Sequence, residues 1–341
     1  MTTKKILNKI CATVIIIIIA IILYNVIGGY RIKYDIENNG KMTIGKYVSQ
    51  GIIYVLLITI SYVFLYPLFS MISLAFMSPT DIINPEIDWI PQSLYFGNFK
   101  VSIVVLDGYK ALFNSFWFSG FLAVAQTVVS AMTGYAFARY DFKFKKLLFT
   151  LILVSFIIPV PLILIPRIMM IVWAQGALDT VLLGTVIPQF TMALLGQGVN
   201  SAILILIFFN FFKMIPSVLY EAAKIDGASA MEQFWHITIK MSFSTIVVVF
   251  LFSFVWNWNE TYVTDILIGE SIELLPSQLR IFNSIFDNRA PEIPGQGGEA
   301  RISEAYKMAA TLLTMIPLFV IYFIAQKQFV EGIEKTGITG E

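Results

Sequence analysis

The stretch 220–241, YEAAKIDGASAMEQFWHITIKM, interrupts a chain that is otherwise dominated by apolar runs. It gathers small and charged residues, among them Glu221, Lys224 and Asp226, together with His236, the only histidine of the 341 residues. Long apolar segments lie on both sides of it. The nature of those segments decides the fold class, and the polar stretch between them is the first candidate for a functional element.

The composition indicates a membrane protein. The chain is 57% hydrophobic and only 13% charged, with a mean hydropathy of +0.78, which is a larger apolar share than a soluble core of this length needs. A net charge of +1 gives no indication of nucleic-acid binding. Cys11 is the only cysteine, which excludes a disulfide within the chain and a cysteine-based zinc cluster.

Apolar runs near the length of about 20 residues that a helix needs to cross a bilayer recur along the chain. They are too long and too continuous for barrel strands. Prolines interrupt the fourth and the last, and neighbouring helices must satisfy the carbonyls freed there, so we expect a packed helical bundle. The predicted spans are 10–29, 48–77, 113–137, 147–172, 199–212 (with an alternative start near 181), 241–264 and 306–327.

The loops between these runs differ in basic charge. Loops 31–47, 138–146 and 213–240 and the tail 327–341 hold 13 Lys and Arg residues, whereas the other loops hold six. The positive-inside rule places the first set, including the quoted stretch, in the cytoplasm. Helix 10–29 begins with a basic segment like that of a signal peptide, but no A-x-A-like site follows it. We expect a retained span with its N-terminus outside; the alternative is an interfacial or hairpin segment.

Ionisable residues are scarce within the predicted spans. Arg167, Glu260 and Asp265 lie near the outer parts of theirs, where snorkelling and a functional role are both open. The chain has no G-x-x-x-x-G-K-[ST] sequence, so if ATP drives this protein, another subunit binds the nucleotide.

The quoted stretch itself predicts a helix, a tight turn and a second helix. Ser229 and Glu232 fit a capping box that starts a helix running toward Lys240. Ser217 is expected to cap a shorter helix through Lys224, with Glu221 in its first turn. Asp226-Gly227 supplies the turn between them. The residues alone leave two readings open, an ordinary helical loop and a docking surface.

The pattern Glu221-Ala-Ala-x-x-Asp226-Gly227-Ala228 closely resembles the EAA motif of bacterial ABC importer permeases. Several further segments resemble the carbohydrate branch of that family, the maltose-type inner-membrane permeases, and the resemblance covers about 48–341. These segments are Asn114-Ser115, Tyr135–Phe142, Ile165-Pro166, Leu178–Thr180, Phe254–Asn259 and Gln326–Gly332.

The resemblance implies an all-α polytopic protein of the bacterial cell membrane. Residues 48–330 would form a type I importer domain of six helices, preceded by an extra helix and linker in 1–47 and followed by a tail, 331–341. A homologous second permease, two cytoplasmic ATPases that hold ATP and magnesium, and an extracytoplasmic solute-binding protein are the implied partners. The chain itself would bind no cofactor and catalyse no reaction.

The resemblance also implies roles for individual residues. The loop 216–240 would dock into an ATPase groove, and the glycines of the tail, Gly332, Gly337 and Gly340, would make a second contact. The residues implied in docking are Glu221, Ala222, Ala223, Asp226, Gly227 and Ala228. Several features depart from the family pattern: Lys240 and Ser244 stand where prolines are common, and Thr339 precedes Gly340 where a lysine is usual. Segment 184–200 is also several residues longer, and we expect an irregular bend there.

The substrate pathway is harder to place. Rings and amides suit sugars, which makes Trp256, Asn257, Asn259 and Glu260 the candidates, although tryptophans near a membrane interface are also common as belt residues. The long loop 265–306 is expected outside, either meeting the binding protein or serving as a connector.

The sequence leaves four candidate functions to compare. The leading hypothesis is a carbohydrate ABC importer permease, and the second is an importer permease for another polar solute such as an amino acid or peptide. An ion-coupled secondary transporter is disfavoured by the nearly uncharged spans, and an intramembrane enzyme by the lack of paired carboxylates or metal-ligating sets within them.

Overall fold

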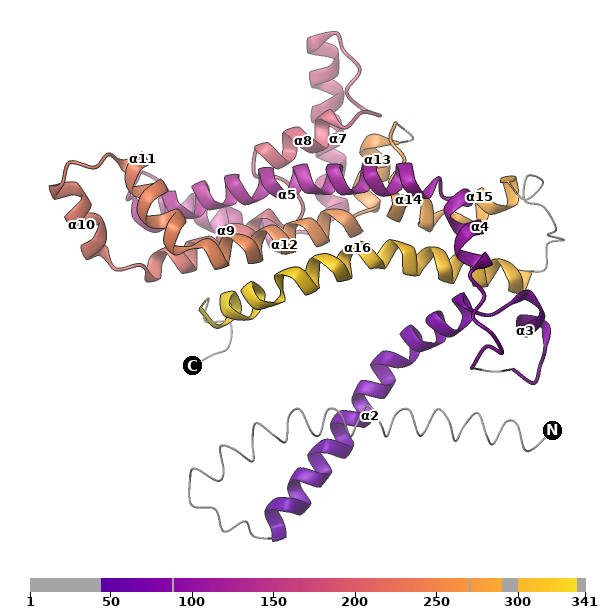
Figure 1. Ribbon diagram of the computed structural model, residues 1–341. Helices are drawn as coiled ribbons and strands as arrows, with labels where there is room; N and C mark the ends of the chain where they lie inside the picture. The colour runs from indigo at the N-terminus through magenta and orange to yellow at the C-terminus, as the bar shows by residue number, and fades with distance from the viewer. Residues whose placement is uncertain (1–43, 88, 270, 290–299, 336–341) are drawn as a thin grey trace. The chain divides into compact units, whose positions relative to one another are not determined.

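The computed structural model describes residues 44–335 apart from 88, 270 and 290–299 (Figure 1). Within these ranges, helices are the only regular secondary structure. The described residues divide into two compact units, the first containing those up to Val105 with those of 282–313 and the second containing Leu106–Ile281 with those from Thr314 onward. The expected helix 10–29 lies outside the described residues.

The first unit is built from α2 (Ile44–Ala75), α3 (Pro79–Ile83), α4 (Gly97–Val105), α15 (Phe282–Arg289) and the start of α16 (Ala300–Lys335). Asn98 fixes the end of α2, because its buried side-chain amide donates to the carbonyls of Ala75 and Met77 at 2.9 and 2.8 Å. Ser102 Oγ donates to the carbonyl of Tyr306 at 2.6 Å, which joins α4 to α16.

The second unit is organised around α5 (Gly108–Arg139). Helices α8 (Ile187–Leu194), α9 (Ser201–Met214) and α12 (Phe243–Asn259) pack against it, as Figure 1 shows. Gly134 allows α9 to approach, since a Cβ at that position would lie 2.7 Å from Phe208 Cβ and 3.0 Å from the backbone nitrogen of Phe209. Small residues at such crossings are how helices in membranes come close enough to pack.

The unit also contains α6 (Lys145–Ile157), α7 (Val160–Leu178), α13 (Tyr262–Ile268), α14 (Leu275–Arg280), the part of α16 from Thr314 and the helices of the stretch 216–240. The predicted span 147–172 is divided between α6 and α7, because Ile158 takes the extended conformation that a following proline favours. Helices α14 and α15 lie within the segment 265–306 that the sequence presents as a loop.

The predicted multi-span helical protein is confirmed. Four of the described helices are long and apolar enough to cross a membrane, and the number rises to six if each of two bent pairs counts as one span. The pairs are α9 with α10 (Ser217–Ile225), bent by 71°, and Ala230–Ile239 with α12, bent by 84°. Helix α9, with 14 residues, is about 21 Å long and therefore shorter than a hydrocarbon core of about 30 Å.

Segment 184–200 forms a short bend, as expected, and not a second full span. It contains the eight residues of α8 between two turns, at Gly184 and at Gly196, both with positive φ.

Candidate functional site

The stretch YEAAKIDGASAMEQFWHITIKM, residues 220–241, folds as a helix–turn–helix between the C-terminal end of α9 and the N-terminal end of α12 (Figure 1). It consists of α10, a turn through Asp226–Ser229, α11 (Ala230–Gln233) and a π-helical turn, η1 (Phe234–Ile239). We call this element, residues 216–240, the docking loop.

The first helix of the docking loop ends in a Schellman motif. The backbone N–H of Ala228 donates to the carbonyl of Ala223 at 2.8 Å, and that of Gly227 donates to the carbonyl of Lys224 at 3.1 Å. This arrangement requires a left-handed residue after the helix, and Gly227 has a φ of 83°. The predicted turn at Asp226-Gly227 is therefore confirmed.

The second helix begins with the capping box that the sequence predicts. Ser229 Oγ accepts from the backbone N–H of Glu232 at 3.3 Å, and the Glu232 carboxylate accepts from the backbone N–H of Ser229 at 2.7 Å. The hydrogen bond from the Ser229 backbone lowers the pKa of the Glu232 carboxyl below its ordinary value. The Glu232 carboxylate therefore stays ionised at neutral pH, and the capping box fixes the backbone where the second helix begins.

The predicted cap of the first helix is wrong. Pro216 is the residue at the cap position, where no side-chain capping hydrogen bond is made, and Ser217 is the first helical residue. Glu221 consequently lies beyond the first turn. The cause is the bend at Ile215, which is extended ahead of Pro216, so the new helix starts directly after the proline.

The docking loop exposes apolar side chains. Val218, Ala222 and Ile225 are spaced so that they share one face of α10, and Val218 and Ile225 are 67% and 86% exposed. Met231 and Trp235, one turn apart, are also more than half exposed. Such a patch is typical of a surface that another protein or the membrane covers.

Arg139, the last residue of α5, holds the docking loop in place. Its guanidinium donates to the carbonyls of Phe212 and Ile215 at the end of α9 and lies 4.1 Å from the centre of the Tyr220 ring. Tyr220 in turn shares a hydrogen bond of 2.8 Å with Thr238 in η1. One cation therefore caps the C-terminus of α9 and fixes α10, and through Tyr220 the second helix as well. We call these contacts the Arg139 latch.

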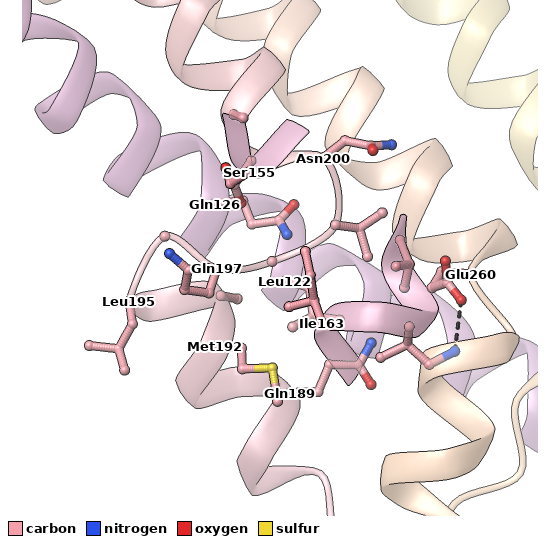
Figure 2. A pocket seen from close by; sticks show the side chains of 18 of the residues that line it. Leu122, Gln126, Ser155, Ile163, Gln189, Met192, Leu195, Gln197, Asn200 and Glu260 are labelled. Atoms are coloured by element: carbon pink, nitrogen blue, oxygen red, sulfur yellow. Dashed lines mark hydrogen bonds between the residues drawn. The ribbon is translucent and has the colours of Figure 1, made fainter. Parts of the chain in front are cut away.

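A second feature is a cavity of about 600 Å³ inside the same unit. Residues of α5, α6, α7, α8, α9, α12 and α13 surround it together with the segment 195–200 (Figure 2). Its volume lies within the range of about 300–1,000 Å³ that small-molecule sites occupy. Amides are prominent in its lining: Gln126, Gln189, Gln197, Asn200 and Asn257.

A buried polar network joins α5 to α12 at this cavity. Gln126 Oε1 accepts from Asn257 Nδ2 at 3.0 Å and from Ser253 Oγ. All three residues are nearly or completely inaccessible to solvent. Interhelical hydrogen bonds of this kind hold spans together where water is absent. Gln126 is the nineteenth of the 32 residues of α5, so the network lies near the middle of that helix.

The structure brings two of the four predicted pathway residues to the cavity. Asn257 and Glu260 line it, and Glu260 also accepts from the backbone N–H of Val263 at 2.8 Å (Figure 2). Trp256 is half-buried and stacks on Phe252, and Asn259 is exposed and donates to a carbonyl of its own helix. Neither of these two lines the cavity.

Gln126 and Gln189 were not among the predicted site residues. Both interrupt apolar segments, and a lone amide there is the signal that could have identified them, because a polar side chain within a span is costly unless it has a role. Of the tail glycines, Gly332 lies within α16, whereas Gly337 and Gly340 lie outside the described residues.

Comparison with known proteins identifies relatives. Residues 126–335 match the family model described as "Binding-protein-dependent transport system inner membrane component". The sn-glycerol-3-phosphate transport system permease protein UgpE of Yersinia enterocolitica is 31% identical over 222 residues, covering 65% of this chain and 71% of that protein. Its counterpart in Pectobacterium atrosepticum is 27% identical over 275 residues, covering 79% and 90%.

A solved structure has the same fold. A chain of a bacterial ABC transporter involved in the import of the acidic polysaccharide alginate superimposes with a TM-score of 0.69 at 18% identity, covering 85% of this chain and all of that one. The type I importer fold implied by the sequence resemblance is thereby confirmed. Because the family model spans more than half of the sequence, the chain belongs to the family of binding-protein-dependent transport system inner membrane components, as a multi-pass permease subunit of an ABC importer.

Proposed function

We propose that this permease imports a carbohydrate or a related hydroxylated solute. It would act with a homologous second permease, two cytoplasmic ATPases that bind ATP and magnesium, and an extracytoplasmic binding protein. Relatives named for sn-glycerol-3-phosphate and alginate transport support a hydroxylated solute. The amide-rich lining of the cavity also supports it, because amides pair with hydroxyl groups as donor and as acceptor.

The docking loop is the observation that carries the proposal that this chain forms the transport path while partner subunits bind ATP. Its exposed face of Val218, Ala222 and Ile225 has the size and apolar character of a helix that inserts into a groove of a partner. The proposed docking residues Glu221, Ala222, Ala223, Asp226, Gly227 and Ala228 form the last turns of α10 and the Schellman turn, all exposed or half-buried. The tail from Gly332 onward would add a second contact with the ATPase.

Purification from native membranes tests this proposal. The tagged chain, extracted in mild detergent, is expected to bring down an ATPase and a second permease, and the complex with its binding protein should take up sugar in proteoliposomes only when ATP is supplied. Recovery of the chain alone from membranes in which it is abundant would overturn the proposal.

A matched pair of variants sharpens the test. Ile225→Asp places a charge in the centre of the exposed face and should release the ATPase, because a buried unpaired carboxylate is costly. Lys224→Ala alters the adjacent residue, which lies off that face, and should leave the complex assembled. Equal behaviour of the two variants would show that this face is not the contact.

A further inference from the structure

We propose that the turn between α5 and α6, together with the start of α6, binds the headgroup of an anionic phospholipid on the predicted cytoplasmic side, with Lys143, Lys146 and Lys213 as the cations that attract it. We call this surface, residues 140–149 with Lys213, the lysine patch. The inference goes beyond the proposed function, because it concerns what the permease takes from its membrane and not what it transports.

Helix α6 carries an apolar surface that the rest of the described chain leaves uncovered. None of its 13 residues is buried, and Leu147, Leu148 and Leu151 are 44–56% exposed. The helix is about 20 Å long, a little more than half of a hydrocarbon core of about 30 Å, and it ends just before Pro159. It therefore offers the acyl chains of one leaflet an apolar surface of matching length.

Cations gather where this apolar surface begins. The turn follows Arg139, so it lies on the side of the membrane that carries the docking loop. Lys145 pairs with Asp141 at 3.0 Å, which offsets one positive charge. Lys143 and Lys146 are exposed, and neither forms an ion pair with a described residue. The turn therefore presents two uncompensated positive charges at the foot of α6.

Contacts between aromatic rings bring a third cation to the patch. The rings of Phe149 in α6 and Phe209 in α9 lie 4.6 Å apart, centre to centre. Lys145 is four residues before Phe149 and Lys213 is four residues after Phe209, so each lies one helical turn from that contact, toward the docking loop. Lys213 is exposed, and its Nζ lies 5.8 Å from the centre of the Phe209 ring. Its ammonium group is therefore placed beside the start of α6.

The start of α6 adds backbone donors to these cations. Phe144 occupies the cap position, and no side-chain capping hydrogen bond is made there. Among the described residues, the backbone N–H groups of Lys146 and Leu147 have no acceptor. The N-terminus of a helix is a site of partial positive charge, and phosphate is an anion that such N–H groups bind. Here the helix end coincides with the side-chain cations of the lysine patch.

The combination of charge and apolar surface identifies the class of ligand. A free phosphate would leave the apolar surface of α6 uncovered, and a lipid without net charge would leave the lysines uncompensated. An anionic phospholipid satisfies both, since its headgroup meets the cations while its tails follow the helix. Phe144 fits this placement, because it is 62% exposed with Lys143 Nζ 5.2 Å from its ring centre, as expected of an aromatic residue at headgroup level.

Native mass spectrometry of the purified full-length chain in detergent tests the proposal. The chain is titrated with phosphatidylglycerol and with phosphatidylcholine of the same acyl chains. Phosphatidylglycerol is expected to bind at least tenfold more tightly, and to be displaced by neither phosphatidylcholine nor glycerol 1-phosphate at the same concentration. Equal affinity for the two lipids would overturn the proposal. Displacement by glycerol 1-phosphate would show that the patch holds a soluble phosphate and would overturn the lipid assignment.

Variants locate the binding. The double variant Lys143→Gln, Lys146→Gln should bind phosphatidylglycerol at least tenfold more weakly, since each lysine near an anionic lipid surface contributes roughly fivefold in affinity. Lys213→Gln alone should weaken binding severalfold. The double variant Lys110→Gln, Lys224→Gln is the control, because it removes the same charge from the opposite end of α5 and from the docking loop, and it should bind as the wild type does.

Arginine separates charge from structure. Lys143→Arg with Lys146→Arg keeps both positive charges and should retain the preference for phosphatidylglycerol. Wild-type affinity in the glutamine double variant, or an equal loss in the control, would refute the assignment to the lysine patch. Loss of a co-purifying protein from the glutamine double variant, with lipid binding unchanged, would show that a protein covers this surface and would refute it as well.

Discussion

Replacing Gly227 tests how much one backbone conformation contributes to the coupling of ATP hydrolysis to transport. Gly227 has a φ of 83°, and beyond its two chain neighbours no atom of the described chain lies within 4 Å of the position that a Cβ would occupy. The cost of a side chain is therefore conformational and not steric. Alanine in this left-handed region costs about 1–2 kcal/mol, and a β-branched valine costs more. Since each 1.4 kcal/mol is a factor of ten, Gly227→Val should shift the balance between the native turn and other turns by at least about tenfold.

The assay is ATP hydrolysis and sugar uptake by the reconstituted complex, with the amount of inserted permease measured in parallel. Gly227→Val is expected to lose most of the hydrolysis stimulated by solute and binding protein while insertion stays intact. Gly227→Asn is the matched control, because asparagine tolerates positive φ, and it should retain most of the stimulation. Full coupling in Gly227→Val would refute the role of the turn. An equal loss in the asparagine variant would refute the backbone explanation and point to a partner surface packed against the glycine.

Three further expectations concern other positions. Gly198→Ala, whose Cβ would overlap the buried Gln126 amide, should lower the melting temperature of the detergent-solubilised protein by several degrees. Arg139→Lys keeps the charge but loses the forked hydrogen bonds, so sugar transported per ATP should fall severalfold while solute affinity is unchanged; an unaltered ratio would contradict the latch. Gly134→Leu should lower the melting temperature of the detergent-solubilised protein by several degrees, because the side chain would collide with Phe208 and the backbone of α9.

Local patterns in the docking loop could be predicted because they depend on neighbours in the sequence. The capping box needs only Ser229 and Glu232 three residues apart, and the turn needs only Gly227 after a helix. The cap at Ser217 was mispredicted because a proline outweighed it: Pro216 fixes the bend, and the helix begins at the next residue. Which of two competing local signals prevails depends on the backbone geometry, and the residue types alone do not contain that geometry.

The cavity could be predicted only in part because it is assembled from distant segments. Asn257 and Glu260 stand out in a polar cluster at the end of a span, whereas Gln126 and Gln189 acquire meaning only when α5, α8 and α12 are brought together. Gly198 is a similar case, since its need for a bare backbone arises from Gln126, 72 positions earlier in the chain.

The bend after the docking loop forms without the prolines that are common in the family. Ser242 makes the corner instead: its backbone N–H donates to the carbonyls of Thr238 and Ile239, and its hydroxyl donates to Thr238 at 2.7 Å. The preceding π-helical turn, η1, shifts the hydrogen-bond register just before the chain turns by 84° into α12. Serine hydroxyls that bond back to a carbonyl bend helices in this way. Lys240 and Ser244 are therefore compatible with the family geometry, because Ser242 supplies the turn between them.

Two helices run between the docking loop and the cavity: α5, whose last residue Arg139 contacts the loop, and α12, which follows the loop in the chain. On α5, Gln126 lies 13 residues before Arg139, a separation of about 20 Å, and on α12, Asn257 lies 15 residues after Ser242, about 22 Å away. We therefore expect a rotation of the docking loop to move the amides at the cavity, because the same two helices reach both places. The Gln126–Asn257 hydrogen bond joins the same two helices at the cavity end, which makes them move as a pair. Loss of the Arg139 latch should therefore separate hydrolysis from transport without changing the affinity of the cavity at rest, because the cavity contacts themselves remain intact.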